Sequence, residues 1–292
     1  MIQLLPFVLA LAAQAPAAKK PEAKPSETPP ISLSFGVYQS EKATVMYRTF
    51  TPVLESLTEA MEAKLQRPVD VKLVIFNNYQ EGIESLVAGR VDFVRFGPAS
   101  YITAKGMQPG IQLLAMETEG GDKRFKGAVV VRKDSSIQKL SDLKGKKFAF
   151  GDPNSTIGRY LIQAELVKAG ITSDQLAGFQ YLGRHDTVVR AVEVGDFDAG
   201  SAMSNTIEKM NSKGNLRIIA TFDNVTKPWV ARKGLEKTTV DAIQQSLCAI
   251  QDASILKELK VSGFVPTSEK DFELVREGMK LAERFEAPPS GQ

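Results

Sequence analysis

The chain has 292 residues, of which 43% are hydrophobic and 24% are charged, and its formal net charge is +3. This composition is typical of a globular protein long enough to form two lobes, and the small net charge argues against nucleic acid as a partner. A single histidine and a single cysteine leave too few ligands for a zinc site, and one cysteine cannot form an internal disulfide. We therefore expect neither a metal nor another cofactor.

The first 30 residues differ from the rest of the chain. Residues 1–15 carry an apolar run followed by small residues, which is typical of a secretory signal peptide and too short to span a bilayer, since spanning takes about 20 residues. Residues 16–30 are rich in Pro, Ala and Lys and predict a flexible linker. No cysteine directly follows the apolar run, so we expect a secreted protein and not a lipoprotein. Cys248 extends the apolar face of a predicted helix and is interpreted as core packing.

From Ile31 onward, strands and helices alternate. In the first series we predict strands at 31–38, 69–76, 91–96 and 111–117, with helices at 45–66, at 79–89 and from residue 97. A polar, glycine-rich segment at 119–127 separates this series from a second one. There we predict strands at 127–133, 146–150, 179–183, 197–202 and 216–222, with helices at 136–145, 185–195 and 205–210 and one ending at 169. Residues 238–286 are expected to be helical.

This alternation predicts an α/β protein with two lobes, each a mostly parallel sheet flanked by helices. We assign residues 31–126 and 223–292 to the first lobe and residues 127–222 to the second. Because ligands of open α/β sheets bind beyond the carboxyl ends of the strands, the cleft between the lobes is the expected site.

Polar loops follow several of the predicted strands. They are residues 77–79, residues 97–101 with Ser100 and Tyr101, residues 152–156, and residues 183–186. Three of these loops open helices, whose unpaired N–H groups and dipoles attract anions, so they could converge on one anion. The same residue types are ordinary helix caps, so a purely structural role stays open.

His185, Tyr79 and Tyr101 lie in these loops, and each could equally be a packed structural residue. Ser155, His185 and an aspartate could also form a nucleophile, base and acid. The Gly-x-Ser-x-Gly elbow that supports such a nucleophile is missing, however, so we do not expect an enzyme. A secreted hydrolase remains an alternative that loss of esterase activity in Ser155→Ala would reveal.

Three segments resemble the phosphate/phosphite/phosphonate solute-binding family of ABC transporters. They are VDFVRFGPASYI, then GAVVVRKDSSIQKLSDLKGKKFAFGDPNSTIGRYL, then GRHDTVVRAVEVGDFDAGSAMS. The resemblance runs from Phe35 to Phe285, and the combination of GDPNST with G-x-H-D-x-V-V-R-A-V is specific. It implies a type II periplasmic binding protein that closes two lobes over its ligand and delivers it to an ABC permease in the inner membrane.

The resemblance also implies which residues bind. The family's phosphonate contacts map onto Tyr79, Ser155, Thr156 and His185, while Phe125 stands where the family has a second tyrosine. Carboxylates that meet the ammonium of aminoalkylphosphonates map onto Asn205 and Lys227, so neither position offers a negative charge. Glu208, three residues from Asn205, could replace one of them.

We therefore expect a ligand without a cationic tail, namely phosphite, methylphosphonate or phosphate, bound by a monomeric protein in the periplasm. Burial of an ammonium without an anionic partner would cost several kcal/mol. The alternative is an exported sensory or adaptor protein of the same fold that signals to a membrane partner.

Overall fold

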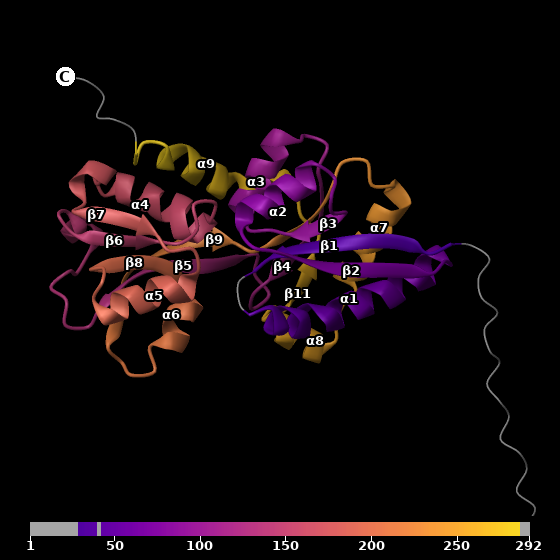
Figure 1. Cartoon of the computed structure of the whole chain (residues 1–292), viewed down its shortest axis with the longest axis horizontal. Coiled ribbons are helices and arrows are strands. Elements are labelled where there is room, and N and C mark those ends of the chain that lie inside the picture. The colour runs from indigo at the N-terminus through magenta and orange to yellow at the C-terminus, as the bar shows by residue number, and fades with distance from the viewer. Residues whose placement is uncertain (1–28, 40–41, 287–292) are drawn as a thin grey trace, which may run out of the picture.

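The computed structural model describes residues 29–39 and 42–286, so the predicted signal peptide and all but the last two residues of the linker lie outside the described residues. Figure 1 shows two lobes side by side, each built on its own sheet. Within the described part of the chain, no helix is long and apolar enough to cross a membrane.

The first lobe contains a six-stranded sheet in the order β11-β4-β10-β3-β1-β2. Its strands are β1 (Ile31–Tyr38), β2 (Val69–Phe76), β3 (Phe93–Arg95), β4 (Gln112–Thr118), β10 (Pro228–Ala231) and β11 (Gly263–Val265). Its helices are α1 (Ala43–Leu65), α2 (Tyr79–Val87), α3 (Pro98–Met107), α7 (Lys237–Cys248) and α8 (Ala253–Leu259). Phe35 stacks on Trp229 in the core between the sheet and α1 and α7, with the Phe93 ring tilted against both, and Cys248 packs against the same core.

The second lobe contains a five-stranded sheet in the order β7-β6-β8-β5-β9. Its strands are β5 (Arg124–Arg132), β6 (Lys147–Phe150), β7 (Gly178–Tyr181), β8 (Ala199–Met203) and β9 (Leu216–Val225). Its helices are α4 (Ile162–Lys168), α5 (His185–Val194) and α6 (Ser204–Met210), together with short turns η1 (Leu140–Leu143), η2 (Thr156–Leu161) and η3 (Ser173–Gln175). The η2 turn is π-helical and runs directly into α4.

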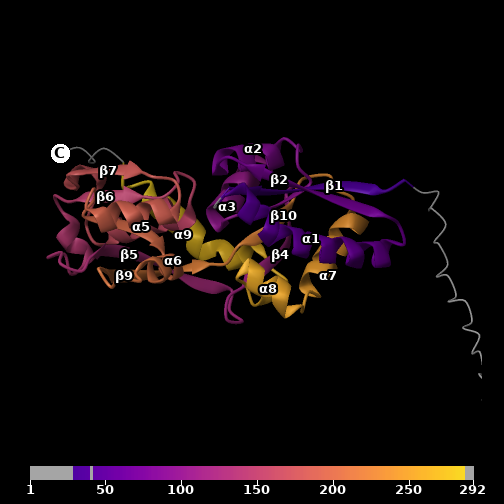
Figure 2. The same cartoon turned by 60° about the horizontal axis from the view of Figure 1, so that its bottom comes forward.

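The α/β class and the two-lobed architecture are confirmed, but the sheets are mixed rather than mostly parallel. The pairs β1–β2, β1–β3, β6–β7 and β6–β8 are parallel, whereas β10 and β11 run antiparallel to their neighbours and β5 runs antiparallel to β8 and β9. The reason is the path of the chain, because β5 and β10 each enter their lobe from the other lobe and so run against the strands that end there (Figure 2).

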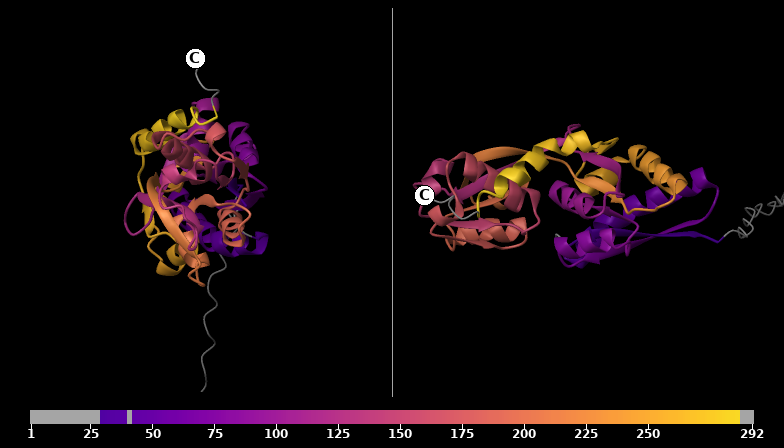
Figure 3. Two further views of the ribbon diagram at one scale, coloured as in Figure 1. Left: turned by 90° about the vertical axis from the view of Figure 1, so that its left-hand side faces the viewer. Right: turned by 90° about the horizontal axis from the view of Figure 1, so that it is seen from above.

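The end of the chain does not stay in the first lobe, to which the sequence analysis assigned it. After η4 (Glu269–Phe272), helix α9 (Glu273–Ala282) runs along one side of both lobes, as the right-hand view of Figure 3 shows in yellow. Beyond it, Phe285 is fully buried in the core of the second lobe, with ring centres 5.5 Å from Phe150 and 5.8 Å from Phe179. Residues 273–286 therefore connect the lobes a third time, after the crossings between β4 and β5 and between β9 and β10.

Two predicted elements differ from the structure. The helix expected at 136–145 is only the turn η1. The Asp142 carboxylate accepts hydrogen bonds from the N–H groups of Gln138 and Lys139 and so caps a turn that begins only at Leu140, and Gly145, with a φ of 70°, follows its end. The helical region expected at 238–286 is interrupted by β11, whose single buried side chain, Phe264, gives no periodic pattern to detect.

Candidate functional site

The carboxyl ends of the parallel strands of the two lobes face each other. In the first lobe the chain leaves β2 and β3 to begin α2 and α3, and in the second it leaves β6, β7 and β8 to begin η2, α5 and α6. Hydrogen bonds join these edges: the Ala99 N–H donates to Thr156 Oγ1 at 2.9 Å, and Asn154 Nδ2 donates to Gln80 Oε1 at 3.3 Å. We call the contact between these two edges the lobe junction.

The loop after β6 is shaped by close backbone contact. The Gly151 N–H donates to the Gly158 carbonyl at 2.7 Å, and a Cβ added to Gly158 would lie 2.7 Å from the Gly151 Cα. Such a distance excludes any side chain at Gly158, so two glycines seven residues apart allow η2 to begin directly against the end of β6. Asp152 Oδ1 then accepts from the Asn154 N–H at 2.7 Å, which folds the turn that presents Ser155.

Ser155 and Thr156 begin η2 at the lobe junction, and both are buried. Ser155 Oγ accepts a hydrogen bond from the Gly158 N–H at 2.9 Å, which is N-cap geometry, and the same hydroxyl acts on Tyr79 of the opposite lobe, whose pKa it lowers. Thr156 Oγ1 accepts from Ala99 of the opposite lobe. The predicted hydroxyls therefore lie between the lobes, at the start of η2.

Two tyrosines stack on the first-lobe side of the junction. The ring centres of Tyr38 and Tyr79 are 3.8 Å apart with an angle of 16° between the planes. Burial raises the pKa of Tyr38 to about 12 and that of Tyr79 well above its usual value, and in both cases the negative charge of Asp152 adds to the effect. Both hydroxyls therefore remain protonated donors. Burial in turn raises the pKa of Asp152.

His185 begins α5 on the second-lobe side and is a neutral imidazole. Burial is the main cause that lowers its pKa to about 4, and the positive charge of Lys227 lowers it further, whereas Asp186 acts in the opposite direction. Lys227 itself lies with its ammonium 5.6 Å from the centre of the Phe125 ring. Three positions named by the sequence analysis, Phe125, His185 and Lys227, are thus brought to one region.

Several polar atoms at the helix starts have no partner. Among the described residues, Ser100 Oγ in α3, His185 Nδ1 in α5 and Ser204 Oγ in α6 are buried without a hydrogen bond. Ser100 lies near the Tyr38 hydroxyl, where it lowers the pKa of that group, but the two form no well-aligned hydrogen bond. Since buried polar atoms in proteins are nearly always paired, these three atoms point to a ligand that would pair with them.

Two predicted residues lie elsewhere. The Tyr101 hydroxyl donates to Glu269 and its ring packs on Phe272, so Tyr101 belongs to the core of the first lobe. The Asn205 side chain is exposed on α6, next to Thr206, and Glu208 on the same helix is exposed as well. The described residues contain no group of His, Cys, Asp and Glu side chains suited to a metal ion.

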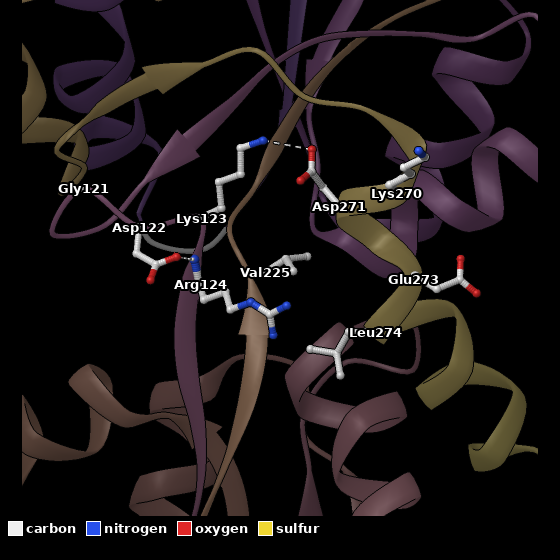
Figure 4. Close-up of a pocket in the computed structure, with 9 residues that line it drawn as sticks. All are labelled: Gly121, Asp122, Lys123, Arg124, Val225, Lys270, Asp271, Glu273 and Leu274. Carbon is white, nitrogen blue, oxygen red and sulfur yellow. Dashed lines mark hydrogen bonds and ion pairs between the residues drawn. The ribbon is translucent and has the colours of Figure 1, made fainter.

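A cavity of about 460 Å³ lies away from the lobe junction (Figure 4). It is formed by the crossing strands and the start of α9, and the Lys123–Asp271 ion pair, with 2.9 Å between Nζ and Oδ2, lies beside it. None of the residues that line it belongs to the predicted site, so we do not assign the ligand to it.

Sequence reasoning missed Tyr38, Ser204 and the cation of Lys227. Tyr38 is the last residue of β1, and its position at the end of a strand beside β2 and β3 was the available signal. Ser204 follows β8 in the same way. The sequence analysis noted only that Lys227 stands where a carboxylate was expected. Its position near His185 could not be predicted, because it depends on the path of the chain between the lobes.

The sequence matches a known protein family and several characterised relatives. Residues 35–272 match the family model described as "ABC transporter, phosphonate, periplasmic substrate-binding protein". The chain is 29% identical to the "Phosphate-import protein PhnD" of Mycolicibacterium smegmatis over 72% of this chain and 67% of that protein. It is 26% identical to the "Probable ABC transporter phosphite binding protein PhnD1" of Prochlorococcus marinus over 86% of this chain and 90% of that protein.

The fold is similar to that of solved structures of substrate-binding proteins. The structure of PhnD1 from Prochlorococcus marinus in complex with methylphosphonate superposes with a TM-score of 0.74 at 22% identity, covering 88% of this chain and all of that one. At this identity the superposition shows the fold alone, and the sequence match carries the family assignment. Because the family model matches most of the chain, the protein belongs to the family of periplasmic substrate-binding proteins of phosphonate ABC transporters.

Proposed function

We propose that this protein captures a small phosphorus oxyanion at the lobe junction and delivers it to an ABC permease. The observation that carries the proposal is the set of unpaired buried polar atoms at the starts of α3, α5 and α6, together with the buried hydroxyls of Ser155 and Thr156 between the lobes. Similarity to proteins named for phosphate and phosphite supports the ligand class.

The phosphorus oxygens would accept hydrogen bonds from neutral donors. Ser155 and Thr156 donate from the start of η2, neutral His185 donates one N–H, and Tyr79 donates from the first lobe. Hydrogen bonds from neutral groups to an ionised oxygen are stronger than those between neutral groups, so a few such donors suffice for specific binding. Lobe closure would bring the donors of both lobes to the same anion.

The ligand lacks a cationic tail. Asn205 and Lys227 offer no negative charge, and Glu208 is exposed to solvent. The Asp152 carboxylate acts on Tyr38 and Tyr79, and the Asp186 carboxylate, which acts on His185, is already paired with Arg184. Phosphite, methylphosphonate and phosphate therefore fit better than an aminoalkylphosphonate.

We further propose that the protein acts as a monomer in the periplasm after removal of its signal peptide, and that it performs no catalysis. The family consists of transport proteins, and Ser155 serves as a helix cap rather than forming a hydrogen bond with His185. Mass spectrometry of the mature amino terminus would test the processing of the signal peptide.

Isothermal titration calorimetry with phosphite, methylphosphonate, phosphate and 2-aminoethylphosphonate tests the proposal. We expect binding of at least one of the first three and weak or no binding of the last. Ser155→Ala should weaken that binding, whereas Ser212→Ala, which removes an exposed hydroxyl from a turn, should not. Binding of 2-aminoethylphosphonate alone would overturn the ligand assignment.

A further inference from the structure

Lys227 occupies the short crossing between β9 and β10. Its carbonyl accepts a hydrogen bond from the Glu117 N–H at 3.1 Å, so its backbone is fixed to the first lobe. Its ammonium lies 5.6 Å from the centre of the Phe125 ring, at the start of β5 of the second lobe. The side chain is thus held between the two lobes, at the place where the chain passes from one to the other.

The charge of Lys227 has no direct counter-ion in the protein. Among the residues that the structure describes, no carboxylate oxygen lies within 4.0 Å of its ammonium. Glu117, whose charge acts on it, is already paired with Arg95, with 2.5 Å between Nε and Oε1, and accepts a hydrogen bond from Trp229 Nε1 at 2.9 Å. A half-buried ammonium without an ion pair is costly, so a bound anion is the partner that would stabilise it.

Charged groups lie on both sides of the lobe junction. The negative charge of Asp152 raises the pKa of Tyr38 and Tyr79, while the buried Arg95 guanidinium, which is paired with Glu117, lowers that of Tyr38. On the other side the positive charge of Lys227 acts on His185, whose Nδ1 is buried and unpartnered. Because Arg95 is already paired with Glu117, Lys227 is, among the described residues, the cation at the junction that is left to attract an anion, and it acts beside His185.

We propose that Lys227 is the specificity-determining residue of this site: its ammonium is the counter-charge for a doubly ionised phosphorus oxyanion and rejects ligands that carry an ammonium. This inference rests on the proposed function. It goes further because it assigns the charge state of the ligand and the residue that selects it, whereas hydroxyls and a neutral imidazole alone would not distinguish a dianion from a monoanion by charge.

A change of affinity at neutral pH tests the inference. At pH 7.5, calorimetry should show that Lys227→Gln weakens methylphosphonate binding by about ten- to hundredfold, the range expected for a charge-assisted hydrogen bond. Lys227→Arg should retain most of the affinity. Lys147→Gln is the matched control, because Lys147 is exposed at the amino-terminal end of β6, away from the lobe junction. The ratio of the affinity for methylphosphonate to that for 2-aminoethylphosphonate should decrease in Lys227→Gln, but not in Lys227→Arg or Lys147→Gln.

A pH profile separates a charge effect from a structural one. Burial, followed by the charge of Arg95, lowers the pKa of Lys227 to about 8, while Glu117 and Glu119 raise it and Lys260 lowers it. Above pH 8 the free protein therefore loses the charge, and methylphosphonate affinity should fall by up to about tenfold per pH unit between pH 8 and 10. His185 is neutral throughout this range. Lys227→Arg and Lys227→Gln should both lose this dependence.

The outcomes distinguish the two proposals. If the unaltered protein binds none of the phosphorus oxyanions, the proposed function fails. If it binds them but Lys227→Gln retains both the affinity and the preference against 2-aminoethylphosphonate, the proposed function stands and the role of Lys227 is overturned. Thermal unfolding of each variant before its titration checks that the variant is folded.

Discussion

Thr156 Oγ1 accepts a hydrogen bond from the Ala99 N–H at 2.9 Å, and this bond joins the start of η2 in the second lobe to the start of α3 in the first. The two helix starts that the sequence analysis expected to converge on an anion are therefore in direct contact. If an oxyanion entered between them, one of its oxygens would replace Thr156 Oγ1 as the acceptor of the Ala99 N–H.

Thr156→Val should weaken oxyanion binding by about tenfold or less, the worth of one hydrogen bond. Valine keeps the shape and removes the hydroxyl that lies at the junction. Calorimetry with methylphosphonate measures the effect, and Thr238→Val, at an exposed position of α7, is the matched control. Unchanged affinity in Thr156→Val would show that this hydroxyl lies outside the binding site.

Gly158→Ala should abolish binding and lower the melting temperature. The added Cβ would lie 2.7 Å from the Gly151 Cα, so the loop from Asp152 to Ser155 would have to move. Gly106→Ala is the contrasting variant, because a Cβ there meets nothing within 4 Å in α3 and should stabilise the helix by about 0.5–1 kcal/mol. Differential scanning calorimetry compares the two. Equal stability of both variants would contradict the backbone contact.

The stability of the protein should fall between pH 6.5 and pH 4 because of His185. Its pKa in the folded state is about 4, below the unfolded value, so the unfolded state binds a proton first as the pH falls. Protonation of His185 in the unfolded state lowers the free energy of unfolding by up to about 3 kcal/mol between pH 6.5 and pH 4. Urea unfolding at pH 7, 6 and 5 should show a shallower decline for His185→Gln. If the free energy of unfolding fell with pH to the same extent in the unaltered protein and in His185→Gln, His185 would not be a buried, neutral imidazole.

Phe285→Ala should destabilise the second lobe by about 3–5 kcal/mol, as expected for a buried aromatic residue. Phe285 fills a site against Phe150 and Phe179 and fixes the end of α9 to that lobe. Val194→Ala, at a half-exposed position of α5, should change the free energy of unfolding by less than about 0.5 kcal/mol. A loss in Phe285→Ala no larger than in this control would show that residues 273–286 do not anchor there.

Local patterns in the sequence were enough to place most of the fold. The strands at 31–38 and 69–76 have the predicted bounds, because their apolar runs end at clear helix and turn signals. β11 escaped detection because three residues carry no period. The fate of Phe285 depends on packing between segments more than 100 residues apart, which no local pattern records.

The candidate site was predictable only in part. The strand-end loops identified Ser155, Thr156 and His185, which lie at the lobe junction. Tyr101 was misplaced because a tyrosine at a helix start can turn either way, and here the Glu269 carboxylate accepts its hydroxyl. The role of the Lys227 cation could not be predicted, because it depends on the crossing between the lobes that brings Lys227 next to Phe125.

A crystal structure of the protein with methylphosphonate would show directly where the ligand binds. We expect the phosphorus group at the lobe junction, with its oxygens within hydrogen-bond distance of Ser155, Thr156, His185 and Tyr79 and close to the Lys227 ammonium. A methylphosphonate bound in the cavity beside Lys123 and Asp271, or a junction without ligand at saturating concentration, would contradict this expectation.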